Sequence, residues 1–275
     1  MGNGQLGQGT QDYDFHEDMV KIAENVIHVD YSQTGFVIFL TKEHQLYGMG
    51  NAGCGALQQY EEFDWWRRVN GEHDVAATPV LLMEDVVYAV CGRDDIVGLK
   101  EDGSVWTWGT IYAEGNYASH NVYFVAEPKK ILENAKLVTG GWFHHAALLQ
   151  DGTVWTWGYN GAGNCGVADL TVVGEPTMVA EDVVMVWTDI AVAGWPQPEA
   201  DDFAMAWRGD LRYTAYETIA AFDDIYPRLL DNMVIQKTDG SYWVCGEHAG
   251  TEEKVVHGAE GDYSVICTHE FYPCG

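Results

Sequence analysis

Hydrophobic and polar positions between residues 135 and 166 predict two strands joined by a tight turn. An apolar run leads to the pair Asp151-Gly152, and the next run, Val154–Gly158, alternates β-branched residues with tryptophan as Val-Trp-Thr-Trp. Two such runs on either side of Asp-Gly are typical of a β-hairpin, because the positive φ angles of a type I′ turn match the twist of the strands. We therefore expect a hairpin, followed by a glycine-rich exit, as the basic element of the chain.

This hairpin recurs along the chain. Each copy opens with glutamate followed by asparagine or aspartate, at Glu24-Asn25, Glu84-Asp85, Glu133-Asn134 and Glu181-Asp182. The openings lie 60, 49 and 48 residues apart, and a period near fifty residues indicates stacked supersecondary units. Prolines shortly before three of the openings, Pro79, Pro128 and Pro176, predict a crossover from one sheet to the next.

We interpret residues 1–275 as a single domain, because an all-β fold of this length can have one core. Its predicted parts are a repeat remnant at 1–15, copies near 20–58, 79–118, 128–168 and 176–250, insertions at 59–77 and 189–202, and a closing strand at 255–270. The fourth copy is either one sheet with a large insertion or two sheets of which one has decayed. The closing strand either opens a further sheet or pairs with the N-terminal remnant.

The motifs of the third copy resemble the regulator of chromosome condensation repeat. The matching features are Gly140, His145, Asp151-Gly152, Val154–Gly158 and Asn160–Gly163, and Gly4–Gly7 is similar to the closing Gly-Gln-Leu-Gly of that repeat. The chain looks like a bacterial-type member that starts in mid-repeat. The resemblance implies an all-β fold, a β-propeller of four-stranded blades. We expect four to five blades, fewer than the seven of the family's best-known members, so that the ring can be incomplete.

The charge of the chain disfavours one class of partner, nucleic acid. There are 42 acidic and 14 basic residues, with a net charge of −28. Such a chain is repelled by phosphate backbones, so we do not expect nucleic acid as a partner. The acidic residues form either a solvated surface or a face that captures cations or cationic partners. The sequence also has no apolar run long enough to span a membrane and no signal-peptide pattern, and it leaves compartment and oligomeric state open.

Function varies among proteins that share this repeat. Similar propellers serve as nucleotide exchange factors, ultraviolet receptors, ubiquitin-ligase modules and bacterial β-lactamase inhibitors. The exchange factor binds chromatin through basic termini and a positive surface, which an acidic chain does not match. The ultraviolet receptors use a Gly-Trp-Arg-His segment in which the arginine lies against tryptophans. Here Gly141–His144 has Phe143 in place of the arginine, so we expect that cation–π contact to be lost.

The spacing of histidine, cysteine and acidic residues predicts neither a metal site nor a cofactor site. His144 and His145 are adjacent in a strand and point to opposite faces, and we expect His145 to pack inside the fold. The six cysteines never occur as Cys-x-x-Cys, which argues against a zinc ribbon. The doublets Asp94-Asp95, Asp201-Asp202 and Asp223-Asp224 do not fit a calcium loop, and we expect them in solvated loops.

Tryptophans at alternate positions are expected in the core. Trp106 with Trp108, and Trp155 with Trp157, lie on the same face of their strands and should pack one blade on the next. The sequence contains no Ser-His-Asp order, nucleophile elbow, phosphate loop or dinucleotide fingerprint, so we predict that the protein is not an enzyme.

These patterns predict a noncatalytic protein-binding or scaffold module that uses loops at the faces of the propeller. The candidate contacts lie in the two insertions, because aromatic and arginine side chains are enriched at binding hot spots. They are Trp65, Trp66, Arg67 and Arg68 in the first insertion and Trp195, Asp201 and Asp202 in the second. One alternative is an enzyme or inhibitor-like domain whose acidic central funnel binds a cation or basic ligand. Another is a structural repeat segment of a larger surface protein.

Overall fold

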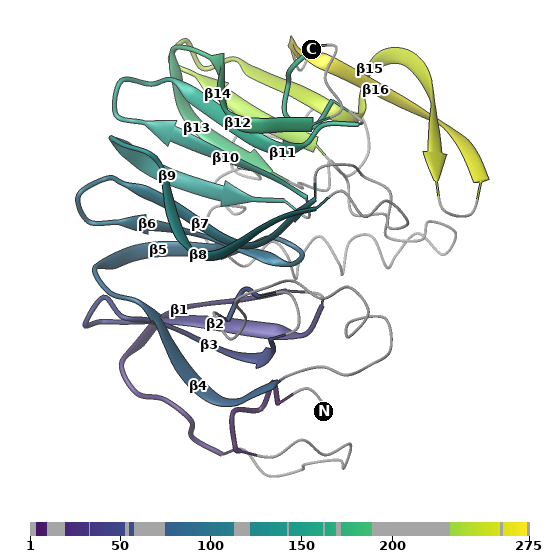
Figure 1. The fold of residues 1–275 in the computed structure, drawn as a ribbon. Helices are drawn as coiled ribbons and strands as arrows, with labels where there is room; N and C mark the ends of the chain where they lie inside the picture. Colours follow the sequence, from purple (N-terminus) through teal and green to yellow (C-terminus); the bar gives the residue numbers. More distant parts are fainter. Residues whose placement is uncertain are drawn as a thin grey trace. The chain divides into compact units, whose positions relative to one another are not determined.

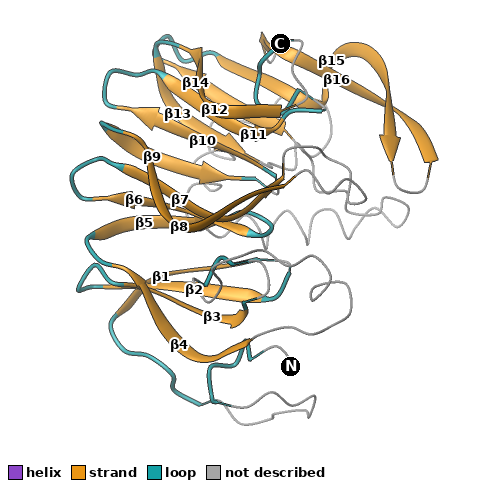
Figure 2. Cartoon of the chain, viewed as in Figure 1, coloured by secondary structure: helices purple, strands orange, loops and turns teal. Residues whose placement is uncertain are grey.

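The computed structural model describes residues 4–9, 20–32, 34–52, 55–57, 75–112, 122–141, 143–161, 163–168, 172–188, 232–258 and 261–273. All regular secondary structure in these residues is β-strand (Figure 2), which confirms the all-β class. The strands form four sheets of four antiparallel strands each (Figure 1), as predicted for propeller blades. Compact packing divides the chain into two units, Met1–Ala113 with His120–Phe143 and Glu114–Ser119 with His144–Gly275.

The strand order within each sheet follows the sequence. The first sheet contains β1 (Val26–Tyr31), β2 (Phe36–Thr41), β3 (Leu46–Asn51) and β4 (Val75–Met83). The second contains β5 (Val86–Cys91), β6 (Asp95–Lys100), β7 (Val105–Tyr112) and β8 (Val122–Leu132). The third contains β9 (Ala135–Gly140), β10 (His144–Leu149), β11 (Val154–Tyr159) and β12 (Val172–Ala180). The fourth contains β13 (Val183–Thr188), β14 (Asn232–Lys237), β15 (Tyr242–Gly258) and β16 (Gly261–Pro273).

Each sheet has two different ends. At the turn end, the second and third strands are joined by a tight turn of four residues, such as Glu101–Ser104 between β6 and β7. At the opposite end, called the loop end here, the first strand connects to the second and the third connects to the fourth. Because neighbouring strands are antiparallel, any insertion in these two connections emerges at the loop end.

A hydrogen-bond relay repeats at the turn ends of three sheets. The Asp102 Oδ1 atom accepts bonds from the backbone N of Ser104 (2.8 Å) and from its Oγ (2.5 Å), and this Oγ accepts a bond from Trp106 Nε1 (2.8 Å). The same relay forms in Asp151–Trp155 and Asp239–Trp243. The bonds from Ser104 hold the pKa of Asp102 below its ordinary value, because they stabilise the carboxylate form. The relay explains why the turn and the first tryptophan recur together.

The backbone conformation explains why each repeat opens with glutamate followed by asparagine or aspartate. The second residues of these openings, Asn25, Asp85, Asn134 and Asp182, have φ angles between 56° and 61°. Asparagine and aspartate tolerate this left-handed region better than other residues with a side chain. In three sheets the carbonyl of this residue accepts a bond from the turn, as Asp85 O does from Glu101 N (3.1 Å). The repeated opening therefore closes the turn end of its own sheet.

The two tryptophans of a pair differ in depth. Trp108 is fully buried, and its Nε1 donates to the carbonyl of Ala56 in the first sheet (2.7 Å). This contact confirms the predicted packing of one sheet on the next for Trp108. Trp106 is only partly buried and is bonded within its own turn. Trp157 is likewise buried, whereas Trp155 is partly exposed.

Three expectations about connections need correction. Pro79, Pro128 and Pro176 do not lie in crossovers but inside β4, β8 and β12. Each of these is the last strand of its sheet, where a missing N–H can face away from the ladder. In consequence each sheet includes the strand before the next Glu-Asx opening, and the first insertion is shorter than 59–77 because Val75 already begins β4.

The fourth copy forms one sheet with an insertion, because β13 pairs directly with β14. Residues 255–270, expected as a single closing strand, instead span the end of β15 and most of β16. These two strands pair as a hairpin whose last partners are Gly258 and Gly261. Of the two alternatives for this segment, a further sheet or pairing with residues 1–15, neither is observed, because β16 pairs with β15 in the fourth sheet.

Candidate functional site

The first insertion leaves from a rigid base at the loop end of the first sheet. Asn51 and Val75, on either side of it, are partners in the ladder of β3 and β4. Ala52, Ala56 and Leu57, which follow β3, are fully buried. The backbone N of Gly55 donates to Ala52 O (2.9 Å), which closes the turn in which Ala56 accepts its bond from Trp108. Residues 58–74 thus start and finish on ordered backbone.

The buried turn at this base is a recurring element. In the third sheet, Gly166 N donates to Gly163 O (2.9 Å), and the enclosed Cys165 is fully buried. Gly7 N donates to Gly4 O (3.0 Å) in the same way. The glycines Gly4, Gly7, Gly163 and Gly166 all have positive φ angles. The Gly-Gln-Leu-Gly segment near the N-terminus therefore adopts the turn with which the third repeat ends.

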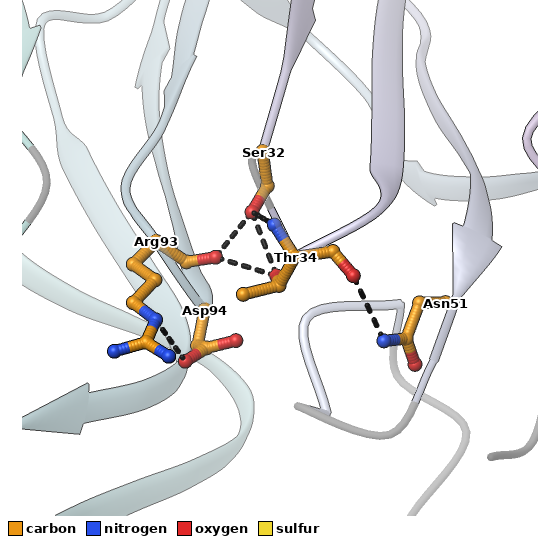
Figure 3. A network of polar contacts seen from close by, with 5 residues as sticks. All are labelled: Ser32, Thr34, Asn51, Arg93 and Asp94. Carbon is orange, nitrogen blue, oxygen red and sulfur yellow. Dashed lines mark hydrogen bonds and ion pairs between the residues drawn. The ribbon is translucent and has the colours of Figure 1, made fainter. Parts of the chain in front are cut away.

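A polar cluster joins the loop ends of the first two sheets (Figure 3). It consists of Ser32, Thr34, Asn51, Arg93 and Asp94 and is called the Arg93 cluster below. The hydroxyls of Ser32 and Thr34 both donate to the carbonyl of Arg93, the second at 2.7 Å. Asn51 Nδ2 donates to the Thr34 carbonyl at 2.9 Å. The cluster therefore ties the base of the first insertion to the β5–β6 loop.

The Arg93 side chain lies between a carboxylate and an aromatic ring. Its Nε is 3.6 Å from Asp94 Oδ2, and its guanidinium carbon is 5.4 Å from the centre of the Phe143 ring. This contact differs from the one in the ultraviolet receptors, where the arginine stands at the position of Phe143 and lies against tryptophans. Arg93 comes from the neighbouring sheet, at a distance of fifty positions in the sequence, whereas the family pattern was compared within one segment.

The doublet Asp94-Asp95 is also not solvated, contrary to the prediction. Both side chains are buried. Burial of a carboxylate requires a charge partner or hydrogen bonds, and Arg93 supplies the charge for Asp94. Asp95 pairs in the ladder with Gly109, whose φ of 106° is available to glycine at little cost. A Cβ at Gly109 would lie 2.6 Å from the Asp94 carbonyl oxygen, so this loop can only close over a glycine.

The second insertion leaves from the loop end of the fourth sheet. It connects β13, which ends at Thr188, with β14, which begins at Asn232. Thr188 and Met233 are partners in the ladder, and Met233 is fully buried. This connection corresponds to the Ser32–Gly35 loop of the first sheet and to the loop that contains Arg93 in the second.

The predicted contact residues themselves lie outside the described residues. These are Trp65, Trp66, Arg67, Arg68, Trp195, Asp201 and Asp202. What the structure adds is the position of the two insertions, each at a loop end, and the Arg93 cluster beside the first one. Sequence analysis missed this cluster because its members come from two different repeats and match no motif.

The adjacent histidines are buried, as expected for His145. His144 Nδ1 lies 3.3 Å from Asn164 Nδ2, and the His145 ring lies 5.7 Å from that of Trp157. Among the described residues no three histidine, cysteine or acidic side chains are grouped so that they could hold a metal ion. Nor does the described part of the chain contain a helix that is long and apolar enough to cross a membrane.

Comparison with known proteins agrees with this architecture. Residues 135–164 match the family described as the regulator of chromosome condensation (RCC1) repeat. The fold is similar to that of human WBSCR16, with a TM-score of 0.52 and 18% identity, covering 80% of this chain and 47% of that one. It is equally similar to Prp20p from Saccharomyces cerevisiae, with a TM-score of 0.52 and 14% identity, covering 90% of this chain and 56% of that one.

The chain thus spans about half the length of these two solved relatives. No curated protein sequence matches it. The family match covers the hairpin from which the sequence analysis began, and the four-stranded antiparallel sheets are those of the similar structures. Residues 135–164 therefore match one regulator of chromosome condensation repeat, and the four sheets have the fold of the β-propeller structures to which the chain is similar.

Proposed function

We propose that this protein is a noncatalytic protein-binding module that contacts its partner through the insertions at the loop ends of the first and fourth sheets. The contact residues are Trp65, Trp66, Arg67 and Arg68, with Trp195, Asp201 and Asp202 in the second insertion. The observation that carries the proposal is the base of the first insertion. Asn51 and Val75, on either side of this insertion, are ladder partners and Leu57 is buried, so the insertion leaves from a fixed place at the loop end of the sheet.

The composition of the first insertion supports a protein partner. Two tryptophans followed by two arginines supply the aromatic and guanidinium groups that dominate binding energy at protein interfaces. The net charge of −28 disfavours nucleic acid and favours a partner with a basic surface. Prp20p, which shares the fold, has binding properties toward Gsp1p and histones. That precedent supports a binding role for the fold and does not identify the partner of this chain.

Partner capture by immobilised protein tests the proposal. Wild-type protein and the double variant Trp65→Ala/Trp66→Ala should unfold at similar temperatures, while the variant loses most of the captured partner. A second pair of variants distinguishes contacts made by the first insertion from a general effect of the protein's charge. Arg67→Ala/Arg68→Ala should weaken capture, whereas Lys42→Ala/Lys136→Ala removes the same charge from exposed positions outside the insertions and should not.

Two outcomes would contradict the proposal. If Trp65→Ala/Trp66→Ala unfolds the protein, the tryptophans belong to the core. If both charge variants weaken capture equally at low salt and neither does so at high salt, the partner is held by long-range electrostatics and the insertion is not its docking site.

A further inference from the structure

The tryptophan of the turn-end relay carries a lysine in two sheets. Lys100 Nζ lies 5.5 Å from the centre of the Trp106 ring, and Lys237 Nζ lies 5.1 Å from the centre of the Trp243 ring. An ammonium group at this distance is attracted to the face of an indole ring. In the second and fourth sheets the cation of this contact therefore comes from the chain itself.

The third sheet has the same tryptophan without the lysine. Lys100, Leu149 and Lys237 occupy the same position, because the carbonyl of each accepts a bond from the glycine of the turn that follows (3.0 to 3.1 Å). Leu149 is apolar and buried. Trp155 keeps its relay bond, from Nε1 to Thr153 Oγ1 (3.0 Å), and is partly exposed. In the part of the chain that the structure describes, no cation lies over the Trp155 ring.

The first sheet shows a third arrangement. Its residue at the tryptophan position, Tyr47, stacks on Phe39 with the ring centres 5.3 Å apart, and its hydroxyl donates to Gln45 Oε1 (3.1 Å). The Tyr47 ring is therefore covered by a side chain of its own sheet. The residue opposite Trp155 in the neighbouring strand is Ala147, which has no ring to cover the indole. Among the described turn ends, only that of the third sheet thus leaves its aromatic ring without a lysine or a stacked ring.

Apolar side chains flank Trp155 where the second sheet has lysines. Met178, the ladder partner of Trp155 in β12, is 45% exposed, whereas the corresponding residue of the second sheet is Lys130. Ala147 pairs with Trp155 on the other side, and Leu149 follows two residues later on the same face. Leu149, Trp155 and Met178 thus form an apolar group, called the Trp155 site below.

Exposed carboxylates border the Trp155 site. Asp151 is the carboxylate of the relay in this sheet. Glu181 and Asp182 lie beside the same turn, because the backbone N of the next residue, Val183, donates to the carbonyl of Gly152 (2.9 Å). All three carboxylates are exposed. They add an attraction for cations to a ring whose face already favours them.

We propose that the Trp155 site binds a lysine side chain of a basic protein partner. The ammonium group would lie over the indole ring, as those of Lys100 and Lys237 do in their own sheets, and the carbon chain would lie along Met178. The bordering carboxylates and the net charge of −28 favour a partner with a basic surface. The site is separate from the two insertions, so it does not depend on the function proposed above.

An NMR titration of the full chain tests the proposal. The probe is the peptide Gly-Ser-Lys-Ser-Lys-Ser-Gly in about 150 mM NaCl, which screens the attraction between distant charges. The indole N–H signal of Trp155, identified by its absence from Trp155→Leu, should move during the titration, and those of Trp106 and Trp243 should not. The same peptide with acetylated lysines has lost the two charges and should leave all three signals in place.

A lysine supplied by the chain itself should compete with the peptide. Leu149→Lys restores the residue found in the second and fourth sheets and should raise the dissociation constant, read from the lysine signals of the peptide, at least about fivefold. The matched control is Gln150→Lys, which adds the same charge at the next residue, an exposed position of the turn. It should change the dissociation constant less than about twofold, because the added charge is screened and does not lie over the ring.

Removal of the ring gives a second matched pair. Trp155→Leu keeps an apolar side chain but has no aromatic face, so it should weaken peptide binding to a similar extent. Trp243→Leu removes the relay tryptophan whose ring Lys237 already occupies, and it should bind the peptide like the wild type. The two variants lose the same relay bond, and their unfolding temperatures show whether the fold is intact.

Three results would overturn the proposal. The first is a Trp155 signal that does not move, or that moves equally with the acetylated peptide. The second is that Gln150→Lys weakens binding as much as Leu149→Lys, because the peptide is then held by the net charge of the protein. The third is equal binding by Trp155→Leu and Trp243→Leu, and this comparison decides the matter if Leu149→Lys does not fold.

Discussion

The turn ends and the loop ends of the sheets follow different rules. At the turn ends, three sheets contain the same Asp-Ser/Thr-Trp relay, and every sheet is preceded by asparagine or aspartate with a positive φ angle. At the loop ends no connection has the same sequence as another. One holds the Arg93 cluster, and two carry long insertions.

This difference follows from what each end must do. Every sheet has to reverse its chain at the turn end and reach the next sheet there, as when Ala135 N of β9 donates to Gly103 O (2.9 Å). That task is identical in each repeat, so the same residues recur. The loop ends share less: each third strand has a glycine with a positive φ angle there, and two sheets have the buried turn, but the connections otherwise differ in length and sequence. They are consequently where a repeat protein can present residues that differ from one sheet to the next.

The largest loss of stability is expected at a loop end, where the loop that contains Arg93 and Asp94 packs closely against Gly109. Gly109→Ala should lower the free energy of unfolding by about 3 kcal/mol, because it adds a positive-φ penalty and a clash with the Asp94 carbonyl. The control is Gly174→Ala, where a Cβ meets nothing within 4 Å, with an expected change within about 0.5 kcal/mol. Denaturant unfolding measures both. Equal effects would mean that the Arg93 loop adapts easily.

A smaller loss of stability is expected when a cationic side chain is removed, either at a loop end or at a turn end. Arg93→Met leaves the buried Asp94 without its charge partner and should cost about 2 to 3 kcal/mol. Lys100 lies 5.5 Å from the Trp106 ring and pairs with the exposed Asp85 at a turn end, so Lys100→Met should cost less than about 1 kcal/mol. If the two variants are equally stable, the Arg93 cluster contributes no more than a surface pair.

The smallest effect concerns the relay and depends on pH. The pKa of Asp102 is lowered in the folded protein, so the bonds from Ser104 stabilise the fold at pH values above the ordinary aspartate pKa, and this contribution is lost as pH falls through the lowered value. Ser104→Ala should therefore be less stable than the wild type at pH 7, with a difference that shrinks in acid below about pH 4. Unfolding at several pH values checks this. A difference that grows in acid would contradict the sign.

The turn ends could be predicted from sequence because their chemistry is local. Asp-Gly turns, alternating tryptophans and Glu-Asx openings each depend on residues within a few positions, so the four sheets and their hairpins follow from the pattern. The alternating tryptophans also indicated a buried face, although not that Trp108 is fully buried and bonded to Ala56 while Trp106 is bonded within its own turn.

The loop ends could not be predicted in the same way, because their contacts join distant repeats. The environment of Asp94 depends on Arg93 beside it and on Phe143 in the next repeat, while Ser32 and Thr34 come from the preceding one. No periodic pattern contains that combination.

The central claim, that the insertions at the loop ends bind the partner while the sheets fold without them, is tested most directly by rewriting the first insertion. Residues 59–73 would be replaced with glycine and serine at unchanged length, which leaves Leu57 and the pairing of Asn51 with Val75 in place. We expect partner capture to be lost while the unfolding temperature changes by no more than about 3 °C. Unchanged capture, or cooperative unfolding at a much lower temperature, would contradict the account.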